Sequence, residues 1–221
     1  MSNICENIEL IRSELNPNTK LIAVSKTKPS SLIREAYNCG QRDFGENKVQ
    51  ELLEKSIELK DLTEIRWHFI GNLQSNKVNQ LLKVQNLYSI HSIDSTKLLR
   101  KILSKRLTSK IKLFLQINTS EELEKNGYDF GDSLGEDIKL ILDSECFEFI
   151  GLMTIGKIRS ENFEDDARLC FRKLSDKRKK LDSNYNLNLE LSMGMSSDYL
   201  IALDYDTNWV RIGSKVFGSR L

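Results

Sequence analysis

The chain alternates between short apolar stretches and longer stretches whose apolar residues recur every three or four positions. The short stretches predict buried β-strands, and the longer ones predict helices with one apolar face. Strands are predicted near residues 20–25, 42–47, 66–70, 87–91, 112–118, 147–153, 187–192 and 208–212. Helices are predicted near 2–14, 30–39, 48–59, 78–82, 95–107, 134–142, 161–182 and 199–203.

This alternation of strands and helices predicts a parallel sheet covered by helices. Eight strand–helix units favour a closed (β/α)8 barrel of the TIM type, in which residues 1–221 form a single domain. An open, doubly wound sheet is the alternative. No linker, internal repeat or low-complexity segment interrupts the pattern.

Composition narrows the possible functions. The chain has 33 Lys and Arg against 32 Asp and Glu, so its overall charge does not favour binding to nucleic acid or to an anionic membrane. No apolar run approaches the roughly 18 residues that a membrane-spanning helix needs. The N-terminal segment does not resemble a signal peptide. The four cysteines, Cys5, Cys39, Cys146 and Cys170, show no CxxC spacing, and we expect four reduced thiols in a cytoplasmic protein.

Lys26 stands out at the end of the first predicted strand. Side chains alternate along a strand, so Ile22, Val24 and Lys26 share one face. Burial disfavours the charged form of a lysine and makes its amine available as a nucleophile, as in Schiff-base lysines. The alternative is that Lys26 merely ends the strand and reaches water.

Polar residues and glycines follow the predicted strands, where a barrel carries its active site. The turns around Ser196 and around Gly213 and Ser214 come after the last two strands, where barrels usually bind phosphate. Glycine permits close approach of a ligand to the backbone, and helix N-termini offer free N–H groups to anions. Each turn alone is equally compatible with a simple helix cap.

Arg211 lies within an apolar strand, which is unusual for a permanently charged side chain. Next to a pyridine nitrogen it would keep that nitrogen unprotonated, because a second positive charge is disfavoured. A structural ion pair with a barrel carboxylate is the alternative. A reactive lysine, a phosphate-binding pair of turns and this arginine together suggest pyridoxal 5'-phosphate (PLP) as cofactor.

Six motifs occur in an order that identifies a family. They are Ile22–Lys28 (IAVSKTK), Phe44–Asn47 (FGEN), His68–Lys77 (HFIGNLQSNK), Gly151–Ile155 (GLMTI), Leu191–Ser196 (LSMGMS) and Val210–Gly213 (VRIG). Over roughly residues 20 to 220 the chain resembles the pyridoxal phosphate homeostasis (YggS/PROSC) family. That family is itself similar to the N-terminal barrel of alanine racemase, a fold-type III PLP-binding barrel, here without the second β domain.

The resemblance implies a role for particular residues. Lys26 would form the Schiff base with PLP, and Arg211 would face the pyridine nitrogen. Ser196, Gly213 and Ser214 would bind the phosphate, while Asn47 and Met153 would line the cofactor. Two positions depart from the family pattern: Glu121 and Ser197 stand where glycine is usual.

The function implied is intracellular PLP homeostasis without catalysis, with release of the cofactor to apoenzymes. We expect no second domain to supply the opposing base that alanine racemase needs, and for the same reason we predict a monomer. His68 and His91 are expected to be hydrogen-bonded barrel residues and not bases. The alternatives are a PLP-dependent amino-acid racemase and, independently of the family, a Schiff-base aldolase acting on a sugar phosphate.

Overall fold

The computed structural model describes residues 3–120, 122, 125–130, 134–157 and 161–218. Within these residues a closed parallel barrel is formed by eight strands: β1 (Lys20–Val24), β2 (Asp43–Glu46), β3 (Arg66–Phe69), β4 (Leu87–Ile93), β5 (Ile111–Asn118), β7 (Phe147–Met153), β8 (Glu190–Met195) and β9 (Trp209–Ile212). A further short strand, β6 (Tyr128–Asp129), pairs only with β5 in this part of the chain. The pairings of β1 with β9 and of β4 with β5 close the ring. The predicted barrel is confirmed, and the open sheet is excluded.

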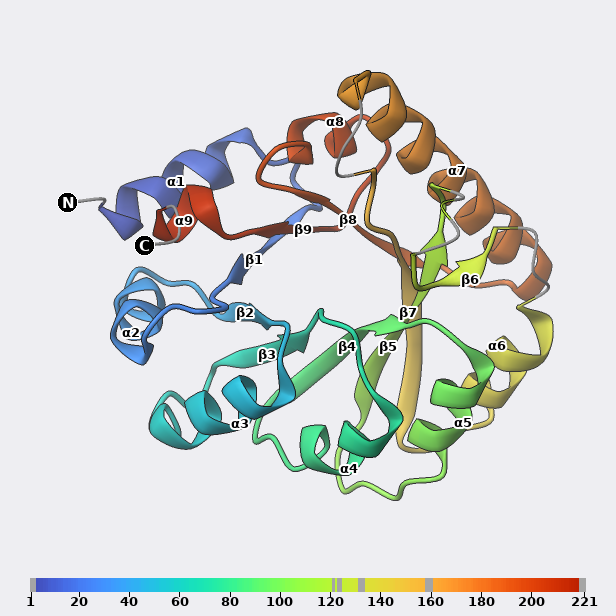
Figure 1. Cartoon of the computed structure of the whole chain (residues 1–221), viewed down its shortest axis with the longest axis horizontal. Coiled ribbons are helices and arrows are strands. Elements are labelled where there is room, and N and C mark those ends of the chain that lie inside the picture. The colour runs from blue at the N-terminus through green and yellow to red at the C-terminus, as the bar shows by residue number, and fades with distance from the viewer. Residues whose placement is uncertain (1–2, 121, 123–124, 131–133, 158–160, 219–221) are drawn as a thin grey trace.

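Helices surround the strands as an outer ring (Figure 1). They are α1 (Ile4–Glu14), α2 (Ser30–Asn38), α3 (Val49–Glu58), α4 (Val78–Leu81), α5 (Thr96–Leu103), α6 (Gly135–Leu142), α7 (Phe163–Tyr185), α8 (Tyr199–Leu203) and α9 (Ser214–Phe217), with a 3-10 turn at Ser75–Lys77. α1 and α9 lie side by side, and Asn7 Nδ2 donates to Val216 O at 3.0 Å.

The alternation of side chains along each strand divides the core into two layers. Leu21 and Ala23 point outward and join the large apolar layer between strands and helices. Ile22 points inward and packs with Phe114, Met153 and Trp209 in a smaller cluster. The face that Ile22 was predicted to share with Val24 and Lys26 is therefore the inner face of the barrel. This face continues to the carboxyl end of β1.

Three element boundaries differ clearly from the sequence prediction. α7 continues to Tyr185, and Asn186 ends it in the left-handed conformation at φ 51°. Asn tolerates this conformation better than most residues. β8 consequently begins at Glu190, three residues after the predicted start. Leu107, predicted to lie in a helix, follows the end of α5 at Leu103.

The prediction of four free thiols is wrong for one pair. Cys5 in α1 and Cys39 after α2 form a disulfide with a Cα–Cα distance of 5.3 Å. Cys146 and Cys170 are free. Cys5 and Cys39 are 34 positions apart in the sequence, and no local pattern indicates that they pair. The packing of α1 beside α2 brings the two residues together.

The described residues contain no helix that is both long and apolar enough to cross a membrane. α7 has 23 residues, but its first turn alone carries three acidic side chains. The same part of the chain contains no group of three or more His, Cys, Asp or Glu side chains suited to a metal ion.

Candidate functional site

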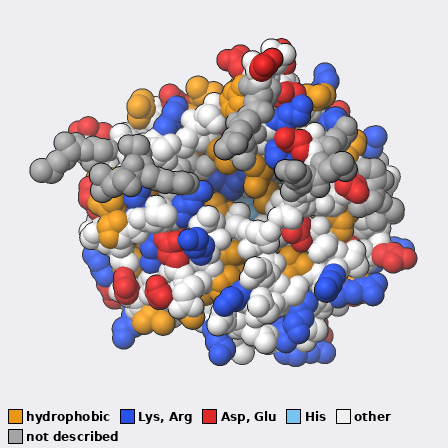
Figure 2. Space-filling model, viewed as in Figure 1, with side chains coloured by type: hydrophobic (Ala, Val, Ile, Leu, Met, Phe, Trp, Pro, Cys, Tyr) orange, Lys and Arg blue, Asp and Glu red, His pale blue; other side chains and the backbone are white. Residues whose placement is uncertain are grey.

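Two adjoining cavities lie at the carboxyl ends of the barrel strands. The larger has a volume of about 380 Å³ and the smaller about 190 Å³. In Figure 2 the centre of the molecule is hollowed, with lysine or arginine side chains next to hydrophobic ones. Val24 and Lys26 line both cavities, so the two spaces meet at the end of β1.

The side chains around the larger cavity are mainly amides, apolar groups and cations. Its lining comprises Val24, Lys26, Asn47, Ile70, Gly71, Asn72, Gln116, Ile117, Asn118, Lys125, Asn126, Ile155, Met195 and Arg211. The smaller cavity is lined by Val24, Lys26, Lys28, Ser196, Gly213, Ser214 and Gly218. Neither described lining contains a histidine, a tyrosine or a carboxylate.

Lys26 lies where the strand pattern predicts, on the same face as Val24, and its side chain lines both cavities. Both neighbouring residues are fixed by side chains from elsewhere. Ser25 Oγ donates to Glu46 Oε1 at 2.7 Å, and Thr27 N donates to Glu51 Oε1 at 2.6 Å. Thr27 adopts φ 64°, an unfavourable conformation for a β-branched residue. Hydrogen bonds on both sides therefore hold the backbone of Lys26 in place.

A buried ionic cluster provides these hydrogen bonds. Lys55 Nζ lies 2.8 Å from Glu46 Oε1 and 2.7 Å from Glu51 Oε1, and it donates to Ser25 O at 2.8 Å. Burial raises the pKa of Glu46, although Lys55 opposes the shift. Sequence reasoning missed Lys55, because a lysine within a helix is usually exposed. The spacing of Glu51 and Lys55, four residues apart on α3, was the available signal.

Arg211 reaches the larger cavity from β9, between Ile22 of β1 and Met195 of β8. Only 5% of the residue is exposed. Burial lowers the pKa of Arg211 to about 10, while Asp198 acts in the opposite direction. The guanidinium therefore stays charged at neutral pH, and it donates to two neutral oxygens, Ser192 Oγ and Thr154 O, each at 2.8 Å.

The smaller cavity brings together the two turns that were predicted to bind phosphate. Gly213 N donates to Ser196 Oγ at 3.3 Å, and Ser214 begins α9. A Cβ atom on Gly213 would lie 3.0 Å from Val24 O, so the absence of a side chain there keeps the two backbone segments close. The donors predicted from separate loops thus line one small space beside Lys26.

The remaining predicted residues are placed less uniformly. Asn47 lines the larger cavity. Met153 is fully buried in the inner cluster of the barrel and is not among the described lining residues. Ser197 is exposed in the turn before α8, and Glu121 lies outside the described residues. Gln116, Lys125 and Asn126 also line the larger cavity but were not predicted. The search for polar residues after strands did not distinguish them from other polar residues.

The two histidines are buried hydrogen-bonded barrel residues, as predicted. His68 contacts Asp43, Ser89 and His91 through its ring nitrogens, and His91 contacts Ser192. Both residues have no exposed surface. Neither belongs to the described lining of the two cavities.

This barrel has counterparts among known proteins. The family model of the alanine racemase N-terminal domain matches residues 1–221. Alanine racemase from Corynebacterium glutamicum has a TM-score of 0.71 at 16% identity, covering 99% of this chain and 61% of that chain. At such low identity this structural likeness concerns the fold alone. The family model and the fold therefore define a barrel of the alanine racemase N-terminal type.

Closer relatives identify the family within this class. The pyridoxal phosphate homeostasis protein of Schizosaccharomyces pombe is 43% identical over 227 residues, covering 100% of this chain and 94% of the relative. PipY of Synechococcus elongatus, solved without PLP, has a TM-score of 0.89 at 37% identity over 97% of this chain and 100% of that chain. Its structure with PLP bound has a TM-score of 0.86. The chain belongs to the pyridoxal phosphate homeostasis protein family.

Proposed function

We propose that this protein binds PLP and takes part in PLP homeostasis, with Lys26 as the residue that holds the cofactor covalently. The observation that carries the proposal is that Lys26 lines both cavities. PLP carries its aldehyde and its phosphate ester on adjacent carbons of an aromatic ring. A larger and a smaller space that meet at one amine suit such a molecule. The names of the relatives and the PLP-bound PipY structure support the same ligand.

The residues present fit the two parts of the cofactor. We assign the phosphate to the smaller cavity, where Ser196 and Ser214 supply hydroxyl donors and Gly213 adds no side chain that would fill the space. The ring would lie in the larger cavity near Asn47 and Arg211. Contact between Met153 and the ring stays a prediction, because Met153 lies in the inner cluster of the barrel.

When bound, PLP supplies an aldehyde that condenses with a primary amine to a Schiff base and releases water. Lys26 is positioned for this bond by the hydrogen bonds to Ser25 and Thr27. Because Arg211 retains its charge, it disfavours a second positive charge on a nearby ring nitrogen. An unprotonated ring is a poor electron sink, which favours holding and releasing the cofactor over catalysis on it.

A PLP-dependent amino-acid racemase is the second candidate, favoured by the match to the alanine racemase N-terminal domain. Racemisation needs a base on each face of the bound amino acid. The described cavity linings contain lysines but no histidine, tyrosine or carboxylate. This composition supports the non-catalytic function. Exchange of the α-hydrogen of amino acids faster than with free PLP would instead establish the racemase.

The central experiment is borohydride reduction of the protein after incubation with PLP, followed by intact mass measurement and peptide mapping. We expect one pyridoxyl phosphate group on the peptide that contains Lys26, and no such group in Lys26→Ala. Lys48→Ala is the matched control, because Lys48 is an exposed lysine just after Asn47 and lines neither cavity.

Labelling of Lys26→Ala at the level of the control would contradict the proposal. If a sugar phosphate but not PLP is trapped on Lys26, the aldolase alternative applies. The cytoplasmic location, the monomeric state and the single-domain organisation stay predictions from the sequence.

A further inference from the structure

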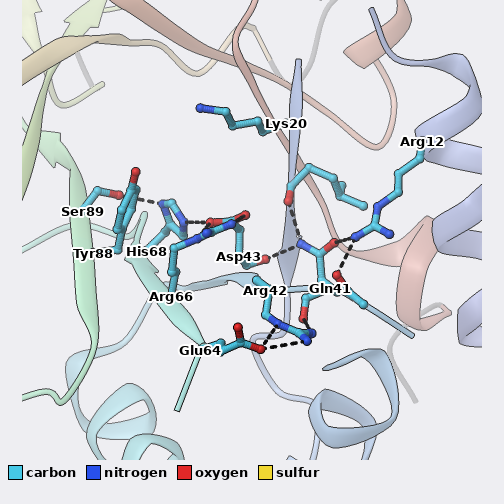
Figure 3. Close-up of polar contacts among 12 residues, drawn as sticks. Arg12, Lys20, Gln41, Arg42, Asp43, Glu64, Arg66, His68, Tyr88 and Ser89 are labelled. Carbon is cyan, nitrogen blue, oxygen red and sulfur yellow. Dashed lines mark hydrogen bonds and ion pairs between the residues drawn. The ribbon is translucent and has the colours of Figure 1, made fainter. Parts of the chain in front are cut away.

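A buried series of polar side chains crosses the barrel interior from the amino ends of the strands to Arg211. His68 Nε2 lies 2.9 Å from Asp43 Oδ1 (Figure 3). His68 Nδ1 lies 3.1 Å from His91 Nε2, and His91 Nδ1 lies 2.8 Å from Ser192 Oγ. Arg211 Nη1 donates to Ser192 Oγ at 2.8 Å. These contacts link the first residue of β2 with a residue that lines the larger cavity.

Asp43 determines the position of the hydrogen on His68. Burial acts to raise the pKa of Asp43, but hydrogen bonds from His68 and Arg66 outweigh it and lower the pKa to about 2. The carboxylate is thus ionised and only accepts hydrogen bonds, so His68 Nε2 carries a hydrogen. Burial also lowers the pKa of His68, which favours the neutral ring. His68 Nδ1 is then an acceptor.

The hydrogen order of the next residues follows by elimination. His91 Nε2 faces the acceptor nitrogen of His68, so it must carry a hydrogen to avoid two opposed lone pairs. Burial lowers the pKa of His91 well below its ordinary value, so its Nδ1 is an acceptor and Ser192 donates to it. The oxygen of Ser192 accepts from Arg211, whose guanidinium has only donors. All the hydrogen bonds therefore donate in one direction, from Arg211 toward Asp43.

Ring packing preserves this order. His91 stacks on Phe114 with ring centroids 4.2 Å apart and an interplanar angle of 14°. His68 lies against Tyr88 and Trp209, with centroid distances of 5.2 and 5.1 Å. Ser89 Oγ, 2.7 Å from His68 Nδ1, can donate to the same acceptor without changing the order. A reversed order at His91 would place an unprotonated Nε2 against the acceptor nitrogen of His68, 3.1 Å away.

We propose that Asp43, His68, His91 and Ser192 are positioning residues for Arg211. Their one-way hydrogen-bond order presents Ser192 to the guanidinium as an acceptor and keeps both imidazoles uncharged beside it. Thr154 O receives a second hydrogen bond, so two points fix the plane of the guanidinium. The remaining N–H groups of Arg211 are left for the larger cavity. The inference deepens the proposed function and rests on it only for the readouts that involve PLP.

The first test needs no cofactor. In protein with ¹⁵N-labelled histidine and without PLP, long-range ¹H–¹⁵N correlation spectra at pH 7 report the tautomer of each ring. We expect His68 and His91 both to be neutral with the hydrogen on Nε2. In Asp43→Asn the carboxamide can donate to His68 Nε2, and we expect the hydrogen of His68 to move to Nδ1. A hydrogen on Nδ1 of either wild-type histidine, or a charged ring, would overturn the proposed hydrogen-bond order.

The second test measures PLP. Ser192→Ala removes one of the two acceptors of Arg211, and we expect on the order of 10-fold weaker PLP binding, as for a lost hydrogen bond to a charged group. We also expect a shift in the absorption maximum of the bound cofactor or in its pH dependence. Ser89→Ala is the matched control. It removes a hydroxyl that contacts His68, but Ser89 is not part of the series of hydrogen bonds from Arg211 to Asp43. Its spectrum and affinity should match the wild type.

The outcomes separate the two proposals. Equal affinity and spectra for Ser192→Ala and wild type would overturn the positioning role while PLP binding stands. Absence of PLP binding by the wild type would overturn the proposed function, whereas the tautomer measurement would still decide the hydrogen-bond order. If a variant does not fold, the wild-type tautomers remain the deciding observation.

Discussion

The two ends of the barrel use similar charged residues in different ways. At the amino ends of the strands, charged side chains pair with one another: Asp43 on β2 lies 2.6 Å from Arg66 on β3, and Lys20 on β1 lies 3.8 Å from Glu190 on β8. At the carboxyl ends, Lys26 and Arg211 line cavities. In (β/α)8 barrels the amino end commonly serves stability and the carboxyl end function. The charged residues named here follow that arrangement, since they pair with one another at the amino ends and line cavities at the carboxyl ends.

Figure 3 shows how the stabilising end is arranged. Asp43 lies between Arg66 and His68, and Gln41 Nε2 donates to Asp43 O at 2.7 Å. Lys20 lies over the ring of Trp209 at 4.6 Å, which places an aromatic ring beneath the cation. Removal of one such partner leaves others unpaired, whereas removal of a cavity-lining side chain mainly removes a contact to a ligand. This difference leads to three predictions.

The largest expected effect is on folding stability at the amino end. Asp43→Ala leaves His68 and Arg66 without their acceptor, and we expect a loss of about 3 kcal/mol in the free energy of unfolding. The partial exposure of Arg66 limits the loss. Lys26→Ala should change the free energy by less than about 1 kcal/mol. Urea denaturation of both variants measures the difference; equal losses would show that the two ends do not differ in this way.

A smaller effect on the stability of the fold is expected when the pH is lowered. The pKa values of His68 and His91 are lowered by burial, so below about pH 6.5 the unfolded chain binds more protons than the folded one and stability falls. The pKa of Asp43 is lowered from 3.8 to about 2. Stability that this carboxylate provides above pH 4, about 2 kcal/mol, is lost as the pH falls toward 2.

The measurement is the urea midpoint between pH 8 and pH 2. Lys26→Ala should follow the wild-type profile, since Lys26 does not belong to the buried polar series. Asp43→Asn should lack the decrease between pH 4 and 2. A wild-type midpoint that stays constant from pH 7 to pH 5 would contradict neutral buried histidines.

The smallest expected effect concerns the phosphate end of the site. Ser214→Ala removes one hydroxyl from the smaller cavity and should weaken PLP binding on the order of 5-fold, or about 1 kcal/mol, without changing the urea midpoint. Fluorescence titration with PLP measures the affinity. Ser31→Ala is the control, because Ser31 is exposed in α2 and lines neither cavity. An unchanged affinity in Ser214→Ala would place the phosphate elsewhere.

Sequence reasoning was most successful where the signal was local. The alternation of Ile22, Val24 and Lys26 correctly predicted which face of β1 leads to the site. The turns that contain Ser196 and Gly213 were recognised from glycine and hydroxyl residues after strands, and they meet at one cavity. Topology alone brings the carboxyl ends of parallel strands together, so no exact boundary was needed.

Prediction failed where the decisive partner is distant in sequence. The pairing of Cys5 with Cys39 depends on how α1 and α2 pack. The burial of Lys55 depends on the direction in which α3 faces Glu46. The contact between Met153 and the cofactor stays a prediction; the position of Met153 in the inner cluster depends on strand tilt and register.

The sequence by itself determined the eight-fold alternation, the parallel barrel and the face that Ile22, Val24 and Lys26 share, because these follow from the periodicity of short segments and from their order along the chain. Only the tertiary structure decided that His68, His91 and Ser192 join Asp43 to Arg211. That series requires side chains from five strands to meet at hydrogen-bonding distance, and such distances are set by barrel closure and strand register. No single segment carries that information.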